Sequence, residues 1–152
     1  MSEKYILVID EGTTGTRALI VDRNSEIKGQ AYSEFTQYNP APDRVEHDAE
    51  EIWEATQVMV KRALAEAGLK PTDLAAIGIT NQRETTVVWD RHTGEPVTGA
   101  IVWQCRRTAP MCEELKQKGM SQPIREKTGL IVDAYFSATK LRWILDHIPQ
   151  LS

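Results

Sequence analysis

Apolar residues dominate the first third of the chain in runs that end at acidic residues. Tyr5–Asp10 is continuously apolar up to its last residue, as expected for a strand buried on both faces. Thr16–Asp22 is rich in β-branched and aliphatic residues, and Glu26–Phe35 follows a turn at Asp22–Ser25. These three runs predict strands arranged as an antiparallel meander.

The apolar spacing becomes helical after a loop over Tyr38–Arg44. Asp48 with Glu51 three positions later is typical of a helix start, as the Asp form of a capping box. Apolar residues then recur on one helical face, and Gly68 is placed to end the helix. Leu74–Thr80 is reached through this helix, so it is predicted to be a parallel strand of the same sheet.

The second half of the chain begins with two short apolar runs and ends in helical spacing. We expect strands over Glu84–Asp90 and Ala100–Trp103, then helices over Arg107–Gly119, Ser121–Lys127 and Ser137–His147. Three antiparallel strands followed by helix-connected parallel strands predict an α/β fold with a mixed sheet.

Composition narrows the class of protein. The chain has 152 residues, the size of one ordinary domain, with 41% hydrophobic and 26% charged residues. Its net charge of −4 argues against binding to nucleic acid, which favours a basic surface. No apolar run approaches the roughly 18 residues needed to span a bilayer, so we expect no membrane insertion and a cytoplasmic protein. Cys105 and Cys112 lie about two helical turns apart, so free thiols are expected.

A cluster of Gly and Thr separates the first two predicted strands, in DEGTTGTR (residues 10–17). Such a turn offers closely spaced backbone N–H groups and hydroxyls, which bind phosphate. Arg17 adds a permanent charge suited to phosphate, and Asp10 is placed to face a hydrated Mg²⁺ on it. The alternative is an elaborate hairpin turn with a surface arginine.

Two further stretches carry candidate chemistry. GITNQRETTVVWD (residues 78–90) places Arg83 and Glu84 between two apolar runs, where an Arg–Glu pair can bind neighbouring hydroxyls. A solvated turn would explain the same residues. AIVWQCRRT (residues 100–108) places Trp103 at the end of a short strand, where its ring could form a wall for the carbons of a polyol or simply belong to the core.

Taken in order, these three stretches resemble the glycerol kinases, which are carbohydrate kinases of the actin-like ATPase (ribonuclease-H-like) superfamily. TGLIVDAYFSATKLRWILDH (residues 128–147) continues the resemblance, with Lys140 and Trp143 in the family's pattern. Arg44–Asp48 stands where a WVEHD segment is common. The sequence departs from the frequent DQGTTSSR at Glu11 and at Gly15–Thr16.

The resemblance implies a role for each matched residue. Thr13, Thr14 and Gly15 would line the ATP phosphates, Arg17 would reach the transferred phosphate, and Asp10 would hold Mg²⁺ through water. The implied glycerol-binding residues are Arg83, Glu84, Trp103 and Tyr135. The implied cofactors are ATP and Mg²⁺, the implied substrates are glycerol and ATP, and the full-length enzyme is expected to be a homo-oligomer.

The resemblance also implies what this chain does not contain. The general base of the family is an Asp in an Asp-Gln pair, and no residue here matches it. We therefore expect residues 1–152 to be the N-terminal part of the first actin-like lobe, without the second lobe and without turnover when isolated. A kinase of another sugar or polyol and a non-catalytic actin-like binding module are the alternatives.

Overall fold

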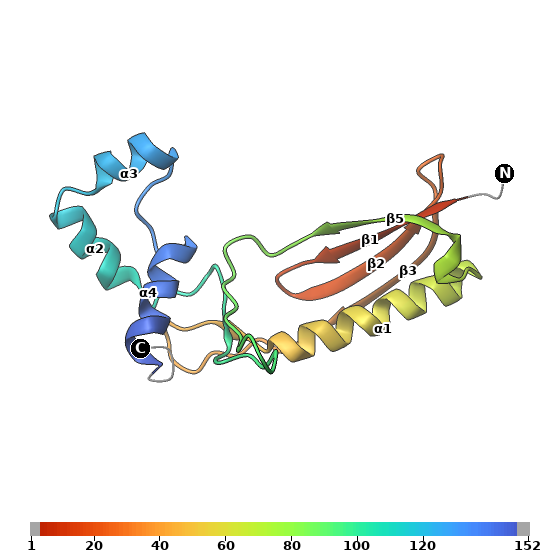
Figure 1. The fold of residues 1–152 in the computed structure, drawn as a ribbon, viewed down its shortest axis with the longest axis horizontal. Helices are drawn as coiled ribbons and strands as arrows, with labels where there is room; N and C mark the ends of the chain where they lie inside the picture. Colours follow the sequence, from red (N-terminus) through yellow and green to blue (C-terminus); the bar gives the residue numbers. More distant parts are fainter. Residues whose placement is uncertain (1–3, 149–152) are drawn as a thin grey trace. The chain divides into compact units, whose positions relative to one another are not determined.

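A computed structural model describes residues 4–148 of the chain, which divide into two compact units (Figure 1). Among the described residues, the first unit contains 4–36 and 48–82, and the second contains 37–47 and 83–148. None of the helices in residues 4–148 has the length and apolar character needed to cross a bilayer.

The first unit is built on a four-stranded mixed sheet. Its strands are β1 (Tyr5–Glu11), β2 (Gly15–Val21), β3 (Ile27–Glu34) and β5 (Leu74–Thr80), in the order β3-β2-β1-β5. β1, β2 and β3 pair antiparallel, and β5 pairs parallel to β1. The predicted meander and the predicted parallel strand are both confirmed, with boundaries within one residue for β1, β2 and β3.

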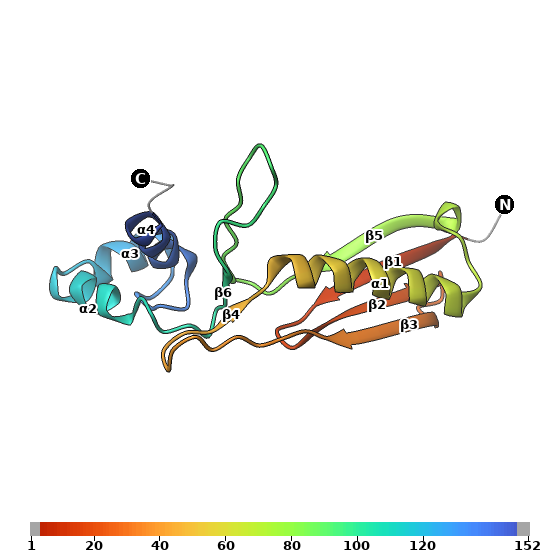
Figure 2. The ribbon, with the colours of Figure 1, turned by 90° about the horizontal axis from the view of Figure 1, so that it is seen from below.

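Helix α1 (Ala49–Ala67) lies along one face of this sheet (Figure 2). Its N-cap is Asp48, as predicted, and the Asp48 carboxylate accepts hydrogen bonds from the backbone N–H groups of Glu50 and Glu51. Gly68 ends the helix with φ 68°, a left-handed conformation that suits glycine. A 3₁₀ turn, η1 (Pro71–Asp73), then leads into β5.

The core of the first unit lies between α1 and the strands it covers. Buried side chains of β1, β2 and α1 form it: Leu7, Ile9, Ala18, Ile20, Met59, Ala63 and Leu64. At Gly29 the helix backbone comes very close to β3, because a Cβ placed there would lie 2.3 Å from the Ala63 carbonyl oxygen. A glycine at this position allows α1 to pack directly onto the sheet.

The second unit combines a two-stranded sheet with three helices. The antiparallel strands are β4 (Glu46–His47) and β6 (Ala100–Ile101). The helices are α2 (Ala109–Gln117), α3 (Ser121–Thr128) and α4 (Ser137–His147). Cys105 and Cys112 are free and buried in two separate apolar clusters, as expected for structural thiols.

The predicted strand over Glu84–Asp90 is wrong. Arg83 and Glu84 form a turn, and only two isolated bridges follow, from Thr86 to Ile101 and from Trp89 to Pro96. The two bridges differ in register, because three positions separate Thr86 from Trp89 and five separate Ile101 from Pro96. The apolar run therefore pairs at single points and does not form a continuous strand.

The other boundaries in this unit shift by smaller amounts. β6 ends at Ile101 instead of Trp103, because the chain turns where the Cys105 N–H donates to the Val102 carbonyl at 2.9 Å. Helix α2 begins at Ala109 rather than Arg107, so Cys105 lies outside it. The C-terminal helix Ser137–His147 is confirmed at both ends.

Candidate functional site

Asp10 and Arg17 lie opposite each other on neighbouring strands. Asp10 is the sixth residue of β1 and pairs with Arg17 of β2 and with Thr80 of β5. Successive side chains of a strand alternate between faces, and Ile9 and Ala18 belong to the core on the α1 face. Asp10 and Arg17 therefore project from the opposite face of the sheet, at the carboxyl ends of the parallel strands β1 and β5. Ligand sites in α/β sheets are found at this edge.

The Gly–Thr turn between β1 and β2 is a tight hairpin held by its own backbone. The Gly12 N–H donates to the Gly15 carbonyl at 3.1 Å, and the Thr14 carbonyl accepts from the Phe35 N–H at 3.4 Å. Thr13 is half-buried and Thr14 is exposed. Gly15 is buried at the start of β2, where it pairs with Glu34 of β3, and a Cβ there would lie 2.4 Å from the Ser33 carbonyl oxygen. Close strand packing thus explains why this position has no side chain.

Arg17 is exposed and stacks on a neighbouring aromatic ring. Its guanidinium carbon lies 5.6 Å from the centre of the Tyr32 ring on β3. Stacking on an aromatic face orients an arginine while leaving its five N–H donors in the plane of the guanidinium. This geometry suits an arginine that must meet a phosphate.

Glu11 has a role that the sequence did not reveal. Its carboxylate accepts a hydrogen bond from the Thr16 hydroxyl at 2.8 Å and one from the Thr56 hydroxyl at 2.7 Å. Thr16 belongs to β2 and is fully buried, whereas Thr56 belongs to α1. Glu11 therefore ties the hairpin to the helix on the α1 face, and its charge points away from Asp10. A pair of threonines at these positions is too ordinary a signal to predict such a link.

In the second unit, Glu84 has an unusual backbone conformation, and its carboxylate accepts hydrogen bonds from the start of a helix. Its φ is 65°, one of two positive values among the described non-glycine residues. Its Oε2 accepts from the Ser137 N–H at 3.0 Å and from the Ser137 hydroxyl at 2.9 Å. Ser137 is the first residue of α4, where the helix dipole favours a negative charge. The carboxylate of Glu84 is thus fixed by the start of α4.

Lys140 connects Glu84 to Tyr135. Its side chain is fully buried, and its ammonium donates to the backbone carbonyls of both residues at 2.6 Å each. Burial lowers the pKa of Lys140 to about 8, although the nearby Glu84 carboxylate favours the charged form. One lysine therefore holds the backbone of two predicted glycerol-binding residues.

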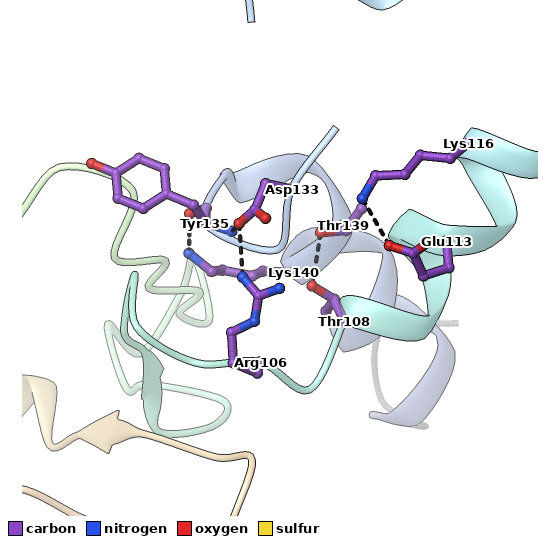
Figure 3. A network of polar contacts seen from close by, with 8 residues as sticks. All are labelled: Arg106, Thr108, Glu113, Lys116, Asp133, Tyr135, Thr139 and Lys140. Atoms are coloured by element: carbon purple, nitrogen blue, oxygen red, sulfur yellow. Dashed lines mark hydrogen bonds and ion pairs between the residues drawn. The ribbon is translucent and has the colours of Figure 1, made fainter. Parts of the chain in front are cut away.

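Tyr135 also joins the group through its ring and its backbone N–H. Its ring packs edge-on against Trp103, with ring centres 5.7 Å apart. Its N–H donates at 2.8 Å to the Asp133 carboxylate, which also pairs with Arg106 at 2.8 Å (Figure 3). Burial raises the pKa of Asp133, but these two contacts outweigh it and the pKa lies below its usual value. In Figure 3 the phenol ring points away from this network.

The structure thus joins Glu84, Tyr135 and Trp103 within the second unit. Arg83 is exposed and precedes Glu84 in the same turn. Asp10, Thr13, Thr14, Gly15 and Arg17 lie together in the hairpin of the first unit. Sequence reasoning did not single out Ser137, Lys140 or Glu11 as site residues, although Lys140 belongs to the family pattern.

The hairpin offers one carboxylate to a metal ion. Among the described residues there is no group of three His, Cys, Asp or Glu side chains that could hold a metal by itself. Mg²⁺ commonly binds one or two carboxylates and completes its octahedron with water and substrate phosphates. A single half-buried Asp10 therefore fits a magnesium ion carried by a bound nucleotide.

Comparison with known proteins identifies the family. Residues 5–152 match the N-terminal domain of the FGGY family of carbohydrate kinases. The chain belongs to this family. Its mixed sheet and helices are the fold of these kinases, as predicted.

Members of the FGGY family named glycerol kinase are among the similar proteins. The glycerol kinase of Halorhodospira halophila is 60% identical over 149 residues, covering 98% of this chain and 29% of the relative. Glycerol kinase 2 of Thermotoga maritima is 59% identical over 145 residues, covering 95% of this chain and 29% of the relative. The crystal structure of Plasmodium falciparum glycerol kinase with ADP matches with a TM-score of 0.90 at 31% identity, over 98% of this chain and 30% of that one. The chain thus spans about a third of the length of these relatives.

Proposed function

We propose that this chain is the N-terminal part of a glycerol kinase, which transfers the γ-phosphoryl group of ATP to glycerol to form sn-glycerol 3-phosphate. The observation that carries the proposal is the cluster of Glu84, Tyr135 and Trp103, which combines a fixed carboxylate with an aromatic surface. Polyols need both, because their hydroxyls require acceptors and their carbons pack on rings. The identity of about 60% to named glycerol kinases supports the same substrate.

On the polyol side, we assign glycerol binding to Arg83, Glu84, Trp103 and Tyr135. Ser137 contacts Oε2 of Glu84, so Oε1 is oriented by that contact and is available to accept from a hydroxyl. Arg83 donates to a neighbouring hydroxyl, and Trp103 packs against the carbon chain. Fixing the alcohol in one orientation aims a single primary hydroxyl at the phosphate.

On the phosphate side, we assign the ATP phosphates to Thr13, Thr14 and Gly15, and the transferred phosphoryl group to Arg17. Asp10 would hold Mg²⁺ through water. The ion supplies positive charge to the phosphates, while Arg17 neutralises charge on the transferred group. Asp10 and Arg17 pair across β1 and β2, which supports their action on one phosphate.

The remainder of the active site lies outside this chain in our proposal. Residues 1–152 form the N-terminal part of the first actin-like lobe, and the general base and the second lobe come from other residues. A base must lie within hydrogen-bond reach of the attacking hydroxyl. The isolated chain should therefore not turn over.

Glycerol-dependent release of ADP tests the proposal. We expect it from a polypeptide that carries this chain together with the remaining length seen in the relatives, and not from residues 1–152 alone. Titration of the isolated chain with glycerol and with Mg-ATP distinguishes a half-site, which binds one of them weakly, from a non-catalytic module, which binds neither. Sustained ADP release by the isolated chain would contradict the assignment of the base to other residues.

We also propose that the kinase works in the cytoplasm, does not bind nucleic acid and forms a homo-oligomer when full-length. Two free buried thiols support a reducing compartment. The net charge of −4 disfavours a polyanionic partner. The oligomer rests on the family resemblance.

A further inference from the structure

Glu84 has a backbone conformation that needs support from its surroundings. A φ of 65° places it in the left-handed region, which is unfavourable for an L-residue with a long side chain. Glutamate cannot offset this cost with the short local hydrogen bonds that Asn and Asp make. The contacts around Glu84 must therefore hold the turn in this form.

Those contacts come from one turn of helix α4. Ser137 binds the Glu84 carboxylate, and Lys140, three residues later, binds the Glu84 carbonyl. Residues three apart on a helix lie on the same face, so both groups meet Glu84 from one surface. Helix α4 thus binds both the side chain and the backbone of Glu84.

Lys140 extends this arrangement to Tyr135. Its ammonium, buried at 0% exposure, donates to the Tyr135 carbonyl at the same 2.6 Å distance. A buried ammonium that lost either acceptor would be left with an unsatisfied donor, which is costly in a low-dielectric interior. The two carbonyls are therefore fixed relative to each other by a single side chain.

We propose that Lys140 is a positioning residue of the polyol site, which sets the distance between the Glu84 carboxylate and the Tyr135 hydroxyl through their backbone carbonyls. This inference rests on the proposed function, because it assigns the geometry of the same site. Lys140 itself does not reach the substrate, since its side chain is buried and its ammonium donates to two backbone carbonyls.

The test is Lys140→Met, which keeps most of the length of the side chain and removes the donor. Steady-state kinetics are measured in the complete kinase polypeptide with glycerol and Mg-ATP varied in turn. We expect the KM for glycerol to rise by about 10-fold or more, with the KM for Mg-ATP changed by less than about twofold. A purely structural role would lower the active fraction, and therefore kcat, without changing the KM for glycerol alone.

Arg142→Met is the matched control on the same helix. It removes one positive charge from an exposed residue that pairs with Asp146, and both KM values should stay within about twofold of the unsubstituted enzyme. Lys140→Gln is the second variant, to be used if Lys140→Met does not fold. It keeps an N–H donor on a shorter, uncharged side chain, which weakens the two bonds to the backbone carbonyls, so the KM for glycerol should rise by about threefold.

The outcomes separate this inference from the function on which it rests. An enzyme that phosphorylates glycerol and keeps its glycerol KM in Lys140→Met, or in Lys140→Gln where that variant replaces it, overturns the positioning role alone. An unsubstituted enzyme that does not phosphorylate glycerol overturns the proposed function, and the positioning role with it.

Discussion

At the scale of single residues, Glu11 is the link between the phosphate-side hairpin and helix α1. Its two oxygens each accept from a threonine hydroxyl, and one of these, on Thr16, is fully buried. The residue preceding it, Asp10, is assigned to the phosphate side. Neighbouring acidic residues thus lie on opposite faces of one strand: Glu11 makes two hydrogen bonds on the α1 face, and we propose that Asp10 acts through its charge on the other.

Replacing Glu11 with Ala should destabilise the first unit by about 1–2 kcal/mol, because the buried Thr16 hydroxyl loses its acceptor. Thr56 is affected less, since its hydroxyl also donates to the Ile52 carbonyl. The free energy of opening, measured by hydrogen exchange of β1 and β2 amides, reports on this unit alone. Glu11→Gln is the control, and its amide oxygen should preserve most of the stability. An equal loss in both variants would show that the carboxylate charge, not the hydrogen bond, is what matters.

Lys140 should make the stability of the second unit depend on alkaline pH. Burial lowers its pKa to about 8, against the opposing influence of Glu84, Cys105 and Asp133, whereas the ordinary pKa of a lysine is 10.5. Between these pH values the unfolded chain holds a proton that the folded chain has released. The free energy of unfolding should therefore rise as pH increases from about 8 to about 10.5, by up to about 3 kcal/mol.

Urea unfolding followed by tryptophan fluorescence measures this dependence. A Trp53→Phe background removes the tryptophan of the first unit and leaves Trp89, Trp103 and Trp143 in the second. In Lys140→Met, the free energy of unfolding should lose the part of its increase with pH that comes from Lys140. In Arg142→Met, that increase should remain. An identical pH dependence in Lys140→Met and the unsubstituted chain would contradict a lowered pKa at Lys140.

The residue types of the candidate site were predictable, but the contacts that fix them were not. Arg83, Glu84 and Trp103 stood out as polar or aromatic residues beside apolar runs, and the family resemblance added Tyr135. The left-handed conformation of Glu84 and its bonds to Ser137 and Lys140 join residues more than fifty positions apart. No local pattern encodes such a pairing, because it depends on how the chain folds back on itself.

At the scale of elements, the close packing of α1 on β3 depends on Gly29. A methyl group there would meet the Ala63 carbonyl at 2.3 Å and the Ala67 nitrogen at 2.7 Å, so α1 would have to move. Gly29→Ala should cost about 1–3 kcal/mol through overpacking. Thermal unfolding measures this loss of stability, and hydrogen exchange of the α1 amides, measured separately, shows whether it affects the helix. Gly78→Ala, on β5 of the same sheet, is the control, since nothing lies within 4 Å of its Cβ position and it should be neutral.

Periodicity predicted the elements of the first unit well and those of the second less well. β1, β2, β3, α1 and β5 have long, uniform patterns and pair with sequence neighbours or across one helix. Glu84–Asp90 also contains an apolar run, yet it pairs only at two isolated bridges that differ in register. Whether a segment forms a strand depends on the segment with which it pairs, and the pattern of one segment does not reveal its partner.

At the scale of the whole molecule, the chain divides its candidate chemistry between two units. The phosphate-side residues belong to the first unit and the polyol-side residues to the second. The length of 152 residues is that of one ordinary domain, and it carries no information about how the contacts divide the chain into units. The family assignment came from motifs in both units, and the match over residues 5–152 confirms it.

The central claim is that this chain binds glycerol through Arg83 and Glu84. Its most direct test is the KM for glycerol of Arg83→Ala and Glu84→Gln in the complete kinase polypeptide. Glu84→Gln keeps an acceptor for Ser137 and removes the charge, so it separates substrate binding from the capping of α4. Arg91→Ala, at an exposed turn of the same unit, is the control. We expect both site variants to raise the glycerol KM by about 10-fold or more, with the KM for Mg-ATP unchanged. An unchanged glycerol KM in both variants would contradict the polyol site.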